Sequence, residues 1–181
     1  LKVSNLDEII VNSDSDEMLE IGKKYGVITQ KREAFYASSI ASNSDFHGHI
    51  GETTNSDYIF LAPVCSPFIG VERHISAIDK FMKSDFDSLT SCNLVKGHLW
   101  LDGKPINYSL DNVPNSQDLP DIKMLNYGIS IIDKKSMMDL RRVVGYNPSF
   151  EVLNDIESID IDDEEVFKIA ELIYNNSSIF F

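Results

Sequence analysis

The sequence predicts an α/β fold, in which a mixed, mainly parallel sheet is flanked by helices and carries a small antiparallel insertion. Two strand-like runs, residues 7–11 and 57–61, are rich in β-branched and aromatic side chains. Each run is followed by a helical pattern of apolar residues, which ends at Gly26 in the first case and spans residues 71–82 in the second. This alternation of strand and helix favours a sheet with parallel strands at its centre.

The middle of the chain has a different pattern, which predicts the antiparallel insertion. Residues 98–101 and 105–108 are strand-like, and Asp102-Gly103 between them is a strong hairpin signal. Polar residues 111–121 predict an exposed loop. The remaining expected elements are strands over 88–94, 123–132 and 150–153 and helices over 136–140 and 164–174. We predict one domain over residues 1–181, with a hairpin and loop insertion at about 94–122.

The composition excludes several classes of protein. The 181 residues include 16 Lys and Arg against 29 Asp and Glu, and the formal net charge of −13 disfavours nucleic acids and anionic membranes as partners. Apolar residues make up 43% of the chain, which is enough for a buried core. No apolar run approaches the roughly 20 residues of a membrane helix. Because Cys65 and Cys92 match no zinc or redox spacing, we expect a protein of the reducing cytoplasm.

The acidic segment before the last expected helix is the sharpest local feature. In an extended stretch Asp160 and Asp162 would point to one side while the isoleucines between and before them pack on the other. Two carboxylates on one face suit Mg²⁺ that carries substrate phosphates. The same segment also fits a structural interpretation, which need not exclude the metal site, since Asp162 as N-cap with Glu165 three residues later resembles a capping box.

Polar side chains in two further regions are candidates for ligand binding. Residues 115–120 and Asn126-Tyr127-Gly128 could form a sugar site, because amides and hydroxyls bond polyhydroxylated ligands and a strand glycine lets a ligand approach the backbone. The same residues also fit an ordinary polar loop. Arg32 and the polar run 38–45 follow an expected strand and could meet a nucleotide, although Ser42 or Asn43 could simply cap the next helix.

Other candidate motifs carry little weight. His47 and His49 lack carboxylate or thiolate partners at metal-binding spacing, so surface or helix-face histidines are expected. Cys65 has no recognisable histidine partner, which disfavours a thiol nucleophile. Residues 62–68 follow a buried strand, where α/β sheets bind ligands, or form a proline-stiffened connection. Neither Gly-rich phosphate-binding motif occurs.

Taken in order, five segments resemble the acylneuraminate cytidylyltransferase family, whose members make CMP-activated sialic acids and related nonulosonic acids. The segments are residues 7–17, Arg32 with Ala41-Ser42, Ser66-Pro67-Phe68, residues 116–120 and residues 158–162. They run over nearly the whole chain and end in paired aspartates before the last helix.

This resemblance implies a nucleotide-diphospho-sugar transferase-like fold and a reaction in which a sugar hydroxyl attacks the α-phosphate of CTP and expels pyrophosphate. It assigns the Mg²⁺ carboxylates to Asp160 and Asp162. It also implies a small dimerisation insertion, and Trp100 and Leu101 beside the hairpin predict an apolar surface for a homodimer partner. The residues placed at the nucleotide are Arg32, Ser42 and Asn43, and those placed at the acceptor sugar are Gln117, Asn126 and Lys96.

Three departures from the family pattern leave alternatives open. The basic, glycine-containing phosphate loop of the family, with its strand, is expected before Leu1. Ala62-Pro63-Val64 stands where the family has a glutamine, and Asn115 replaces an arginine, for which Lys96, Arg141 and Arg142 are possible substitutes. The alternatives are a non-catalytic nucleotide-sugar-binding relative, or a cytidylyltransferase for Kdo or another sugar.

Overall fold

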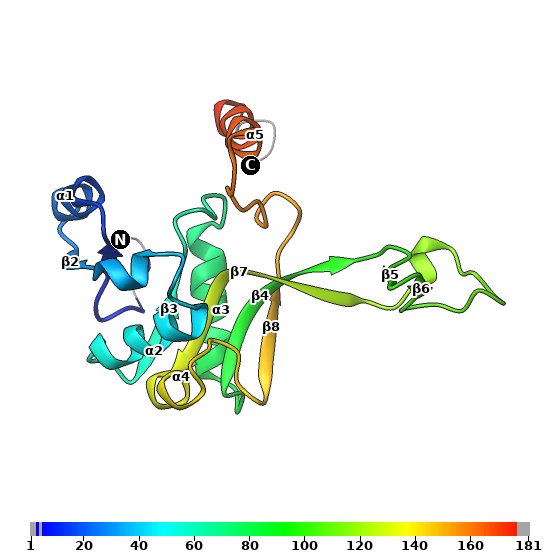
Figure 1. Ribbon diagram of the computed structural model, residues 1–181, viewed down its shortest axis with the longest axis horizontal. Coiled ribbons are helices and arrows are strands. Elements are labelled where there is room, and N and C mark those ends of the chain that lie inside the picture. The colour runs from blue at the N-terminus through cyan, green and yellow to red at the C-terminus, as the bar shows by residue number, and fades with distance from the viewer. Residues whose placement is uncertain (1–2, 4, 177–181) are drawn as a thin grey trace.

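A four-stranded mixed sheet forms the centre of the computed structural model, which describes residue 3 and residues 5–176 (Figure 1). The strand order is β3-β7-β4-β8. β7 is antiparallel to both of its neighbours, while β4 and β8 are parallel, so three of the four strands run in one direction. The bounds are β3 Tyr58–Leu61, β4 Ser88–Val95, β7 Ile122–Asp133 and β8 Pro148–Val152. The predicted mixed α/β class is confirmed. The expected parallel pairing at the centre of the sheet is wrong, because β7 returns from the chain that follows β4 and pairs with it antiparallel.

A separate pair of parallel strands, β1 Ile10–Ser13 and β2 Ile28–Lys31, is connected by helix α1 Asp16–Lys24. Ser15 caps this helix by accepting the backbone N–H of Met18. Gly22 lets the helix lie close to both strands, because a Cβ at this position would come within 3.1 Å of Thr29 and 3.2 Å of Val11. These features form the strand–helix unit that the sequence predicts.

Helices cover both faces of the central sheet. α3 Val71–Met82 packs Ala77, Ile78 and Phe81 into a cluster that contains Ile131, whereas Ile132 belongs to a second cluster beside α4. Since successive side chains of a strand point to opposite faces, the two clusters lie on opposite sides of β7. α2 Asn43–Thr53 packs against α4 Lys134–Leu140, and η1 Ala34–Ala37 precedes α2. No helix in the described ranges is long and apolar enough to cross a membrane.

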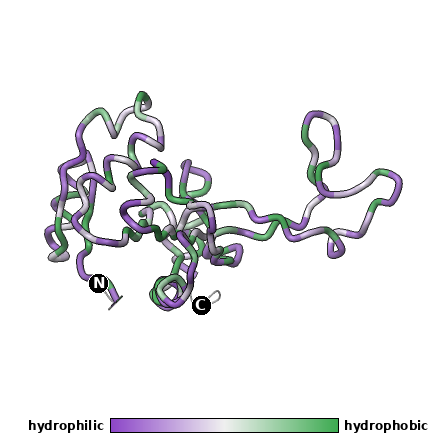
Figure 2. Tube along the Cα trace, turned by 90° about the horizontal axis from the view of Figure 1, so that it is seen from below, coloured by the Kyte–Doolittle hydropathy of each residue, from purple (hydrophilic) through white to green (hydrophobic). Residues whose placement is uncertain are grey.

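An arm projects from the sheet, formed by the far ends of β4 and β7 and the chain between them (Figure 1). Its small hairpin pairs β5 Trp100–Leu101 with β6 Lys104–Pro105, and Asp102 (φ 50°) and Gly103 (φ 75°) make the predicted turn. η2 Ser116–Asp118 lies in its return segment. Figure 2 shows hydrophobic positions along the arm, interleaved with hydrophilic ones.

The second strand of the hairpin is shorter than the predicted 105–108. The side chain of Asn107 accepts the Leu99 N–H at 2.9 Å and donates to the Gly97 carbonyl at 2.8 Å. This side-chain amide takes the place of the strand pairing that the alternating pattern predicted.

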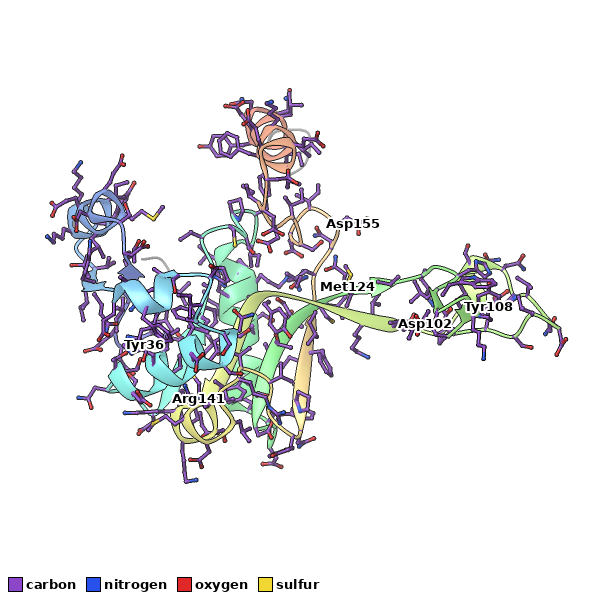
Figure 3. The ribbon with its side chains drawn as sticks, viewed as in Figure 1. Tyr36, Asp102, Tyr108, Met124, Arg141 and Asp155 are labelled. Carbon is purple, nitrogen blue, oxygen red and sulfur yellow. The ribbon has the colours of Figure 1, made fainter. Side chains whose placement is uncertain are left out.

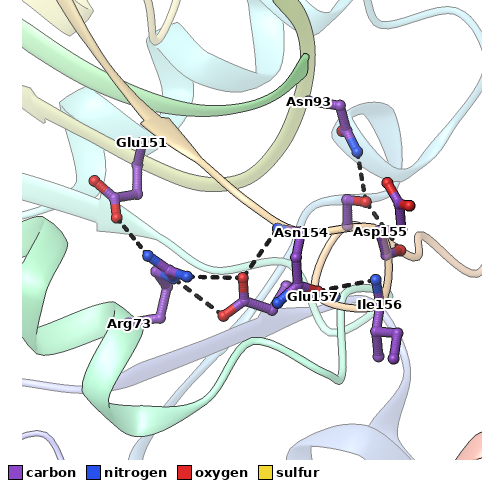
Figure 4. Close-up of polar contacts among 8 residues, drawn as sticks. Arg73, Asn93, Glu151, Asn154, Asp155, Ile156 and Glu157 are labelled. Carbon is purple, nitrogen blue, oxygen red and sulfur yellow. Dashed lines mark hydrogen bonds and ion pairs between the residues drawn. The ribbon is translucent and has the colours of Figure 1, made fainter. Parts of the chain in front are cut away.

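A buried ionic brace holds the turn at residues 154–158, which follows β8, to helix α3 (Figure 4). Arg73 Nε and Nη2 donate to the two oxygens of Glu157, each at 3.0 Å, and Nη1 donates to Glu151 at 3.1 Å. Lys80 adds a second contact to Glu151 at 3.2 Å. The side chains of Glu151 and Glu157 are only 8% and 13% exposed, so Glu157 depends on Arg73 for charge compensation, while Glu151 shares Arg73 and Lys80.

Replacing Arg73 by Met should lower the free energy of unfolding by about 3 kcal/mol, because it leaves two buried carboxylates short of a partner. Urea unfolding at pH 7 measures this loss. Lys83→Met is the matched control, since Lys83 pairs with Asp79 on the surface of the same helix with its side chain 75% exposed. The control should change stability by less than about 1 kcal/mol. Equal losses for the two variants would contradict the brace.

The same contact predicts a pH dependence of stability. Burial raises the pKa of Glu157, but hydrogen bonds from Arg73 and from the Asn154 amide outweigh it and hold the pKa below 4.5. A depressed carboxyl pKa contributes stability that is present above the unfolded value and is lost as pH falls through the folded value. Unfolding titrations between neutral pH and pH 3 should therefore show a stability loss below about pH 4.5 that Arg73→Met reduces. An unchanged slope in the variant would argue against this assignment.

Candidate functional site

The candidate site lies at the edge of the sheet where β3, β4 and β8 end. Because these strands run in one direction, the loop 62–70 after β3 and the segment 153–163 after β8 meet at this edge. The Ile161 amide donates to the Cys65 carbonyl at 2.9 Å and joins the two segments directly. Ligands of open α/β sheets bind at the carboxyl ends of their strands, so this edge is the expected place for chemistry.

The two predicted carboxylates, Asp160 and Asp162, both lie close enough to Cys65 to affect its thiol. Burial first, then Asp160 and finally the charge of Asp162, raise the pKa of Cys65 to about 11. Asp160 Oδ1 is buried and has no hydrogen-bond partner among the described residues. Asp162 is exposed and accepts no hydrogen bond within the described part of the chain. Both carboxylates thus influence one thiol, and their action as a pair stays a prediction.

The predicted capping box at Asp162 and Glu165 is wrong by one residue. Helix α5 Glu164–Asn175 is capped by Asp163, whose Oδ1 accepts the Val166 N–H at 2.8 Å. The hydrogen bond of Ile161 to the loop keeps the preceding residues out of the helix, so the chain turns into α5 only at Asp163. Asp162 is consequently not engaged in capping.

The carboxylate pair is better suited to a hard cation that also binds water and substrate than to a metal ion held entirely by protein side chains. No group of three or more His, Cys, Asp or Glu within residues 3 and 5–176 is arranged to hold a metal ion. Mg²⁺ is usually bound through one or two carboxylates, with water and substrate phosphates as its other ligands. The unpartnered oxygen of Asp160 fits such a role, because a buried carboxylate oxygen without a donor is costly unless something binds it.

The surroundings of Cys65, His47 and His49 do not indicate a nucleophile or a metal site. With a pKa near 11, Cys65 is a neutral thiol at physiological pH, as expected for a residue that is not a nucleophile. His49 is buried in α2 and stacks on Tyr36 with 3.9 Å between ring centroids. Burial lowers the pKa of His47. The two histidines therefore follow the helix-face interpretation.

The residues expected at the nucleotide gather where β1 and β2 end and α2 begins. Arg32 donates to Asn12 Oδ1 at 2.7 Å and to the Asn12 carbonyl at 2.8 Å, and its guanidinium lies 4.5 Å from the Phe46 ring centroid. Ser42 is the N-cap of α2 and forms a capping box with Asp45. Asn43 is the first residue of that helix rather than its cap, and its side chain is exposed.

The residues expected at the acceptor sugar are divided between the sheet and the arm, on which Figure 3 labels Asp102 and Tyr108. Gln117 is exposed in η2, and Lys96 at the base of the arm contacts the Leu119 carbonyl at 2.8 Å and Asp121 at 2.6 Å. Asn126 lies in β7 and donates to Asn93 Oδ1 at 2.7 Å. Among the described residues Gln117 therefore has no hydrogen-bond partner, whereas Lys96 and Asn126 have partners within the chain.

The expectation that Gly128 lets a ligand approach the strand needs correction. A Cβ at Gly128 would lie 2.6 Å from Ile69 Cδ1 and 3.3 Å from Ser66 Oγ. The space beside this glycine is occupied by the loop 62–70. Gly128 thus allows that loop, and with it Cys65, to pack against β7.

Sequence reasoning missed the polar network that supports the acidic segment from the sheet. Ser91 Oγ donates to Asn126 Oδ1 at 2.5 Å, and Asn93 Nδ2 donates to Ser158 Oγ at 2.5 Å (the latter bond is drawn in Figure 4). Arg73 was missed as well. The available signal was the pair of polar residues Ser91 and Asn93 inside an otherwise buried strand, since buried polar side chains need partners.

Comparisons with known proteins agree with this architecture. No family model matches the sequence. The chain is 23% identical to the post-translational flagellin modification protein B of Campylobacter coli, over 94% of this chain and 78% of that protein.

Three solved structures with a similar fold are compared with this chain. One is the 4-diphosphocytidyl-2C-methyl-D-erythritol synthase of Anaerococcus prevotii (TM-score 0.72, 15% identity, 96% of this chain and 81% of that one). Another is CMP:2-keto-3-deoxy-manno-octonic acid synthetase in complex with CTP (TM-score 0.68, 9% identity, 97% and 84%). The bifunctional IspDF of Campylobacter jejuni matches with a TM-score of 0.60 at 11% identity, over 90% of this chain and 42% of that chain. This chain therefore has the nucleotide-diphospho-sugar transferase-like fold that its sequence predicts.

Proposed function

We propose that this chain is a Mg²⁺-dependent cytidylyltransferase that moves CMP from CTP to a sialic-acid-like nonulosonic acid and releases pyrophosphate. The observation that carries the proposal is the pair Asp160 and Asp162 at the carboxyl edge of the sheet, where Asp160 Oδ1 has no hydrogen-bond partner and Asp162 accepts no hydrogen bond among the described residues. A solved structure of the same fold contains CTP. Because CTP is an intracellular metabolite, the proposal also places the protein in the cytoplasm.

The proposed reaction needs positioning and charge compensation more than covalent chemistry by the protein. The sugar hydroxyl oxygen bonds to the α-phosphorus of CTP, the bond from that phosphorus to the pyrophosphate oxygen breaks, and the hydroxyl proton passes to water. Mg²⁺ held by Asp160 and Asp162 would neutralise part of the negative charge of the phosphates. Arg32 and the residues that begin α2 are proposed to bind the nucleotide, whereas Gln117, Asn126 and Lys96 are placed toward the sugar.

One comparison supports a keto-sugar acid as the acceptor, and another is with a protein of flagellin modification. The relative from Campylobacter coli is a flagellin modification protein, and one structural neighbour is a synthetase for CMP-linked 2-keto-3-deoxy-manno-octonic acid. Because of this structural neighbour, transfer of CMP to 2-keto-3-deoxy-manno-octonic acid is the alternative function. Both candidates share an anionic sugar acceptor and the same nucleotide chemistry.

The decisive experiment measures CTP-dependent pyrophosphate release by the full-length protein with a panel of nonulosonic acids. We expect release only when CTP, Mg²⁺ and a nonulosonic acid are all present. Release with 2-keto-3-deoxy-manno-octonic acid alone would establish the alternative substrate. A folded protein that binds nucleotide but releases no pyrophosphate with any acceptor would instead be a non-catalytic relative.

Asp162→Asn should reduce Mg²⁺-supported turnover by about 100-fold or more, because it removes a charge from the proposed metal site. Its melting temperature should change little, since Asp162 is exposed and does not cap α5.

Asp163→Ala is the matched control one residue away. Loss of the N-cap should cost about 1 kcal/mol, or a few degrees of melting temperature, while turnover persists. If Asp162→Asn retained activity and Asp163→Ala lost it, the metal assignment would be wrong.

We also propose that the arm forms a homodimer through residues 94–108. Trp100, Leu101 and Ile106 expose 52%, 62% and 56% of their surface on this arm, which is a large apolar area for an isolated chain. Light scattering of the full-length protein should give a mass twice that of one chain. The double variant Trp100→Ser with Leu101→Ser should shift it to the monomer mass, whereas Tyr25→Ser, directly after α1, should not. A monomeric parent protein would contradict the homodimer.

A further inference from the structure

Tyr127 has a backbone conformation that large side chains rarely adopt. Residues 126–129 of β7 bulge out of the sheet, because Thr90 pairs with Ser130 while Cys92 pairs with Leu125. Within this bulge Tyr127 has a φ of 55°, in the left-handed region. Only glycine, and to a lesser degree asparagine and aspartate, enters this region at little cost, so a tyrosine here is strained.

Hydrogen bonds of the neighbouring residues stabilise the bulge, but none of those described involves the tyrosine ring. Asn126 Oδ1 accepts from Ser91 Oγ at 2.5 Å and from the Gly128 N–H at 3.3 Å, and the Ile129 N–H donates to Ser91 Oγ at 2.9 Å. The Tyr127 side chain is 46% exposed and has no hydrogen bond or ring contact within the described ranges. No hydrogen bond or ring contact of the side chain therefore offsets the strain, and strained residues of this kind concentrate at ligand sites.

The two neighbours of Tyr127 connect it to both segments that hold Asp160. On one side Gly128 packs against Ser66 and Ile69 of the loop 62–70, whose Cys65 carbonyl accepts the Ile161 amide. On the other side Asn126 reaches Ser158 through Asn93, in bonds of 2.7 and 2.5 Å. Tyr127 is thus fixed beside the proposed reaction centre by contacts that do not involve its ring.

The positions of the strands indicate which substrate this ring can meet. Arg32 and Ser42 follow β2, which belongs to the separate two-stranded pair, whereas the loop with Cys65 follows β3, and Tyr127 lies in β7, the direct neighbour of β3. A nucleotide bound by Arg32 and Ser42 and phosphates bound near Asp160 leave the exposed ring of Tyr127 for the acceptor. An aromatic ring offers an apolar face to sugar C–H groups and a hydroxyl for a hydrogen bond.

We infer that the Tyr127 ring forms one wall of the acceptor-sugar site and selects for the sugar ring by stacking on it. This inference rests on the proposed cytidylyl transfer, and it assigns the backbone strain to ligand binding. The test uses Tyr127→Gly, which removes both the ring and the strain, and Tyr127→Phe, which keeps the ring and the strained backbone.

Tyr127→Gly should raise the melting temperature by about 2 °C, because glycine tolerates positive φ. It should also raise KM for the nonulosonic acid about tenfold, while KM for CTP and kcat stay within about twofold of the parent values, as expected for a contact that binds ground and transition states equally. Tyr127→Phe should retain the parent melting temperature and stay within about threefold of the parent KM for the sugar. A merely structural role could not raise stability and weaken sugar binding in one variant.

Calorimetric binding of a panel of nonulosonic acids that includes N-acetylneuraminic acid separates this inference from the proposed reaction. If the parent binds a sugar that Tyr127→Gly no longer binds, the inference stands even when pyrophosphate release is absent. An unchanged KM or affinity for the sugar in Tyr127→Gly overturns it. A rise in KM for CTP as large as that for the sugar, or a parent that binds none of these acids, overturns it as well.

Discussion

The hydrogen bond from the Ile161 amide to the Cys65 carbonyl, 2.9 Å long, joins the segment after β8 to the loop after β3. Everything proposed for Asp160 and Asp162 depends on this junction, because carboxylates on an unattached segment could not be directed at a substrate. Two further contacts limit its movement: Arg73 holds Glu157 from helix α3, and Asn93 holds Ser158 from β4. Bonds from a helix, a strand and a loop thus fix one short irregular segment, as preorganised charge requires.

Much of the fold follows from local patterns in the sequence. The β1–α1 unit, α3 and the Asp102-Gly103 turn are where hydrophobic period and turn chemistry place them, since each depends on neighbouring residues. The shortened hairpin is different, because Asn107 uses its side chain across the arm. The bulge at residues 126–129 also has no local signal, since a tyrosine at positive φ contradicts the preferences of its own residue type.

The candidate site was predictable in its residue types but not in its contacts. The spacing of Asp160 and Asp162 indicated a carboxylate pair, whereas the choice between Asp162 and Asp163 as helix cap depended on the long-range bond of Ile161. Gly128 was expected to admit a ligand, and Ile69 occupies that space instead. Arg73 lies 84 positions before Glu157 in the chain, and no pattern in one sequence links such residues.

Arg32 differs from Arg73 and Lys96 in the proposed site because its positive charge is not paired with a carboxylate in the described part of the chain. The chain has a net charge of −13, yet its proposed substrates are a triphosphate and an anionic sugar. The charges of Arg73 and Lys96 are already matched by carboxylates of Glu151, Glu157 and Asp121. Among the described residues the Arg32 guanidinium contacts only the uncharged Asn12 and Phe46, and no acidic side chain forms an ion pair with it. Its positive charge therefore remains available, and an oriented but uncompensated guanidinium is suited to phosphate recognition.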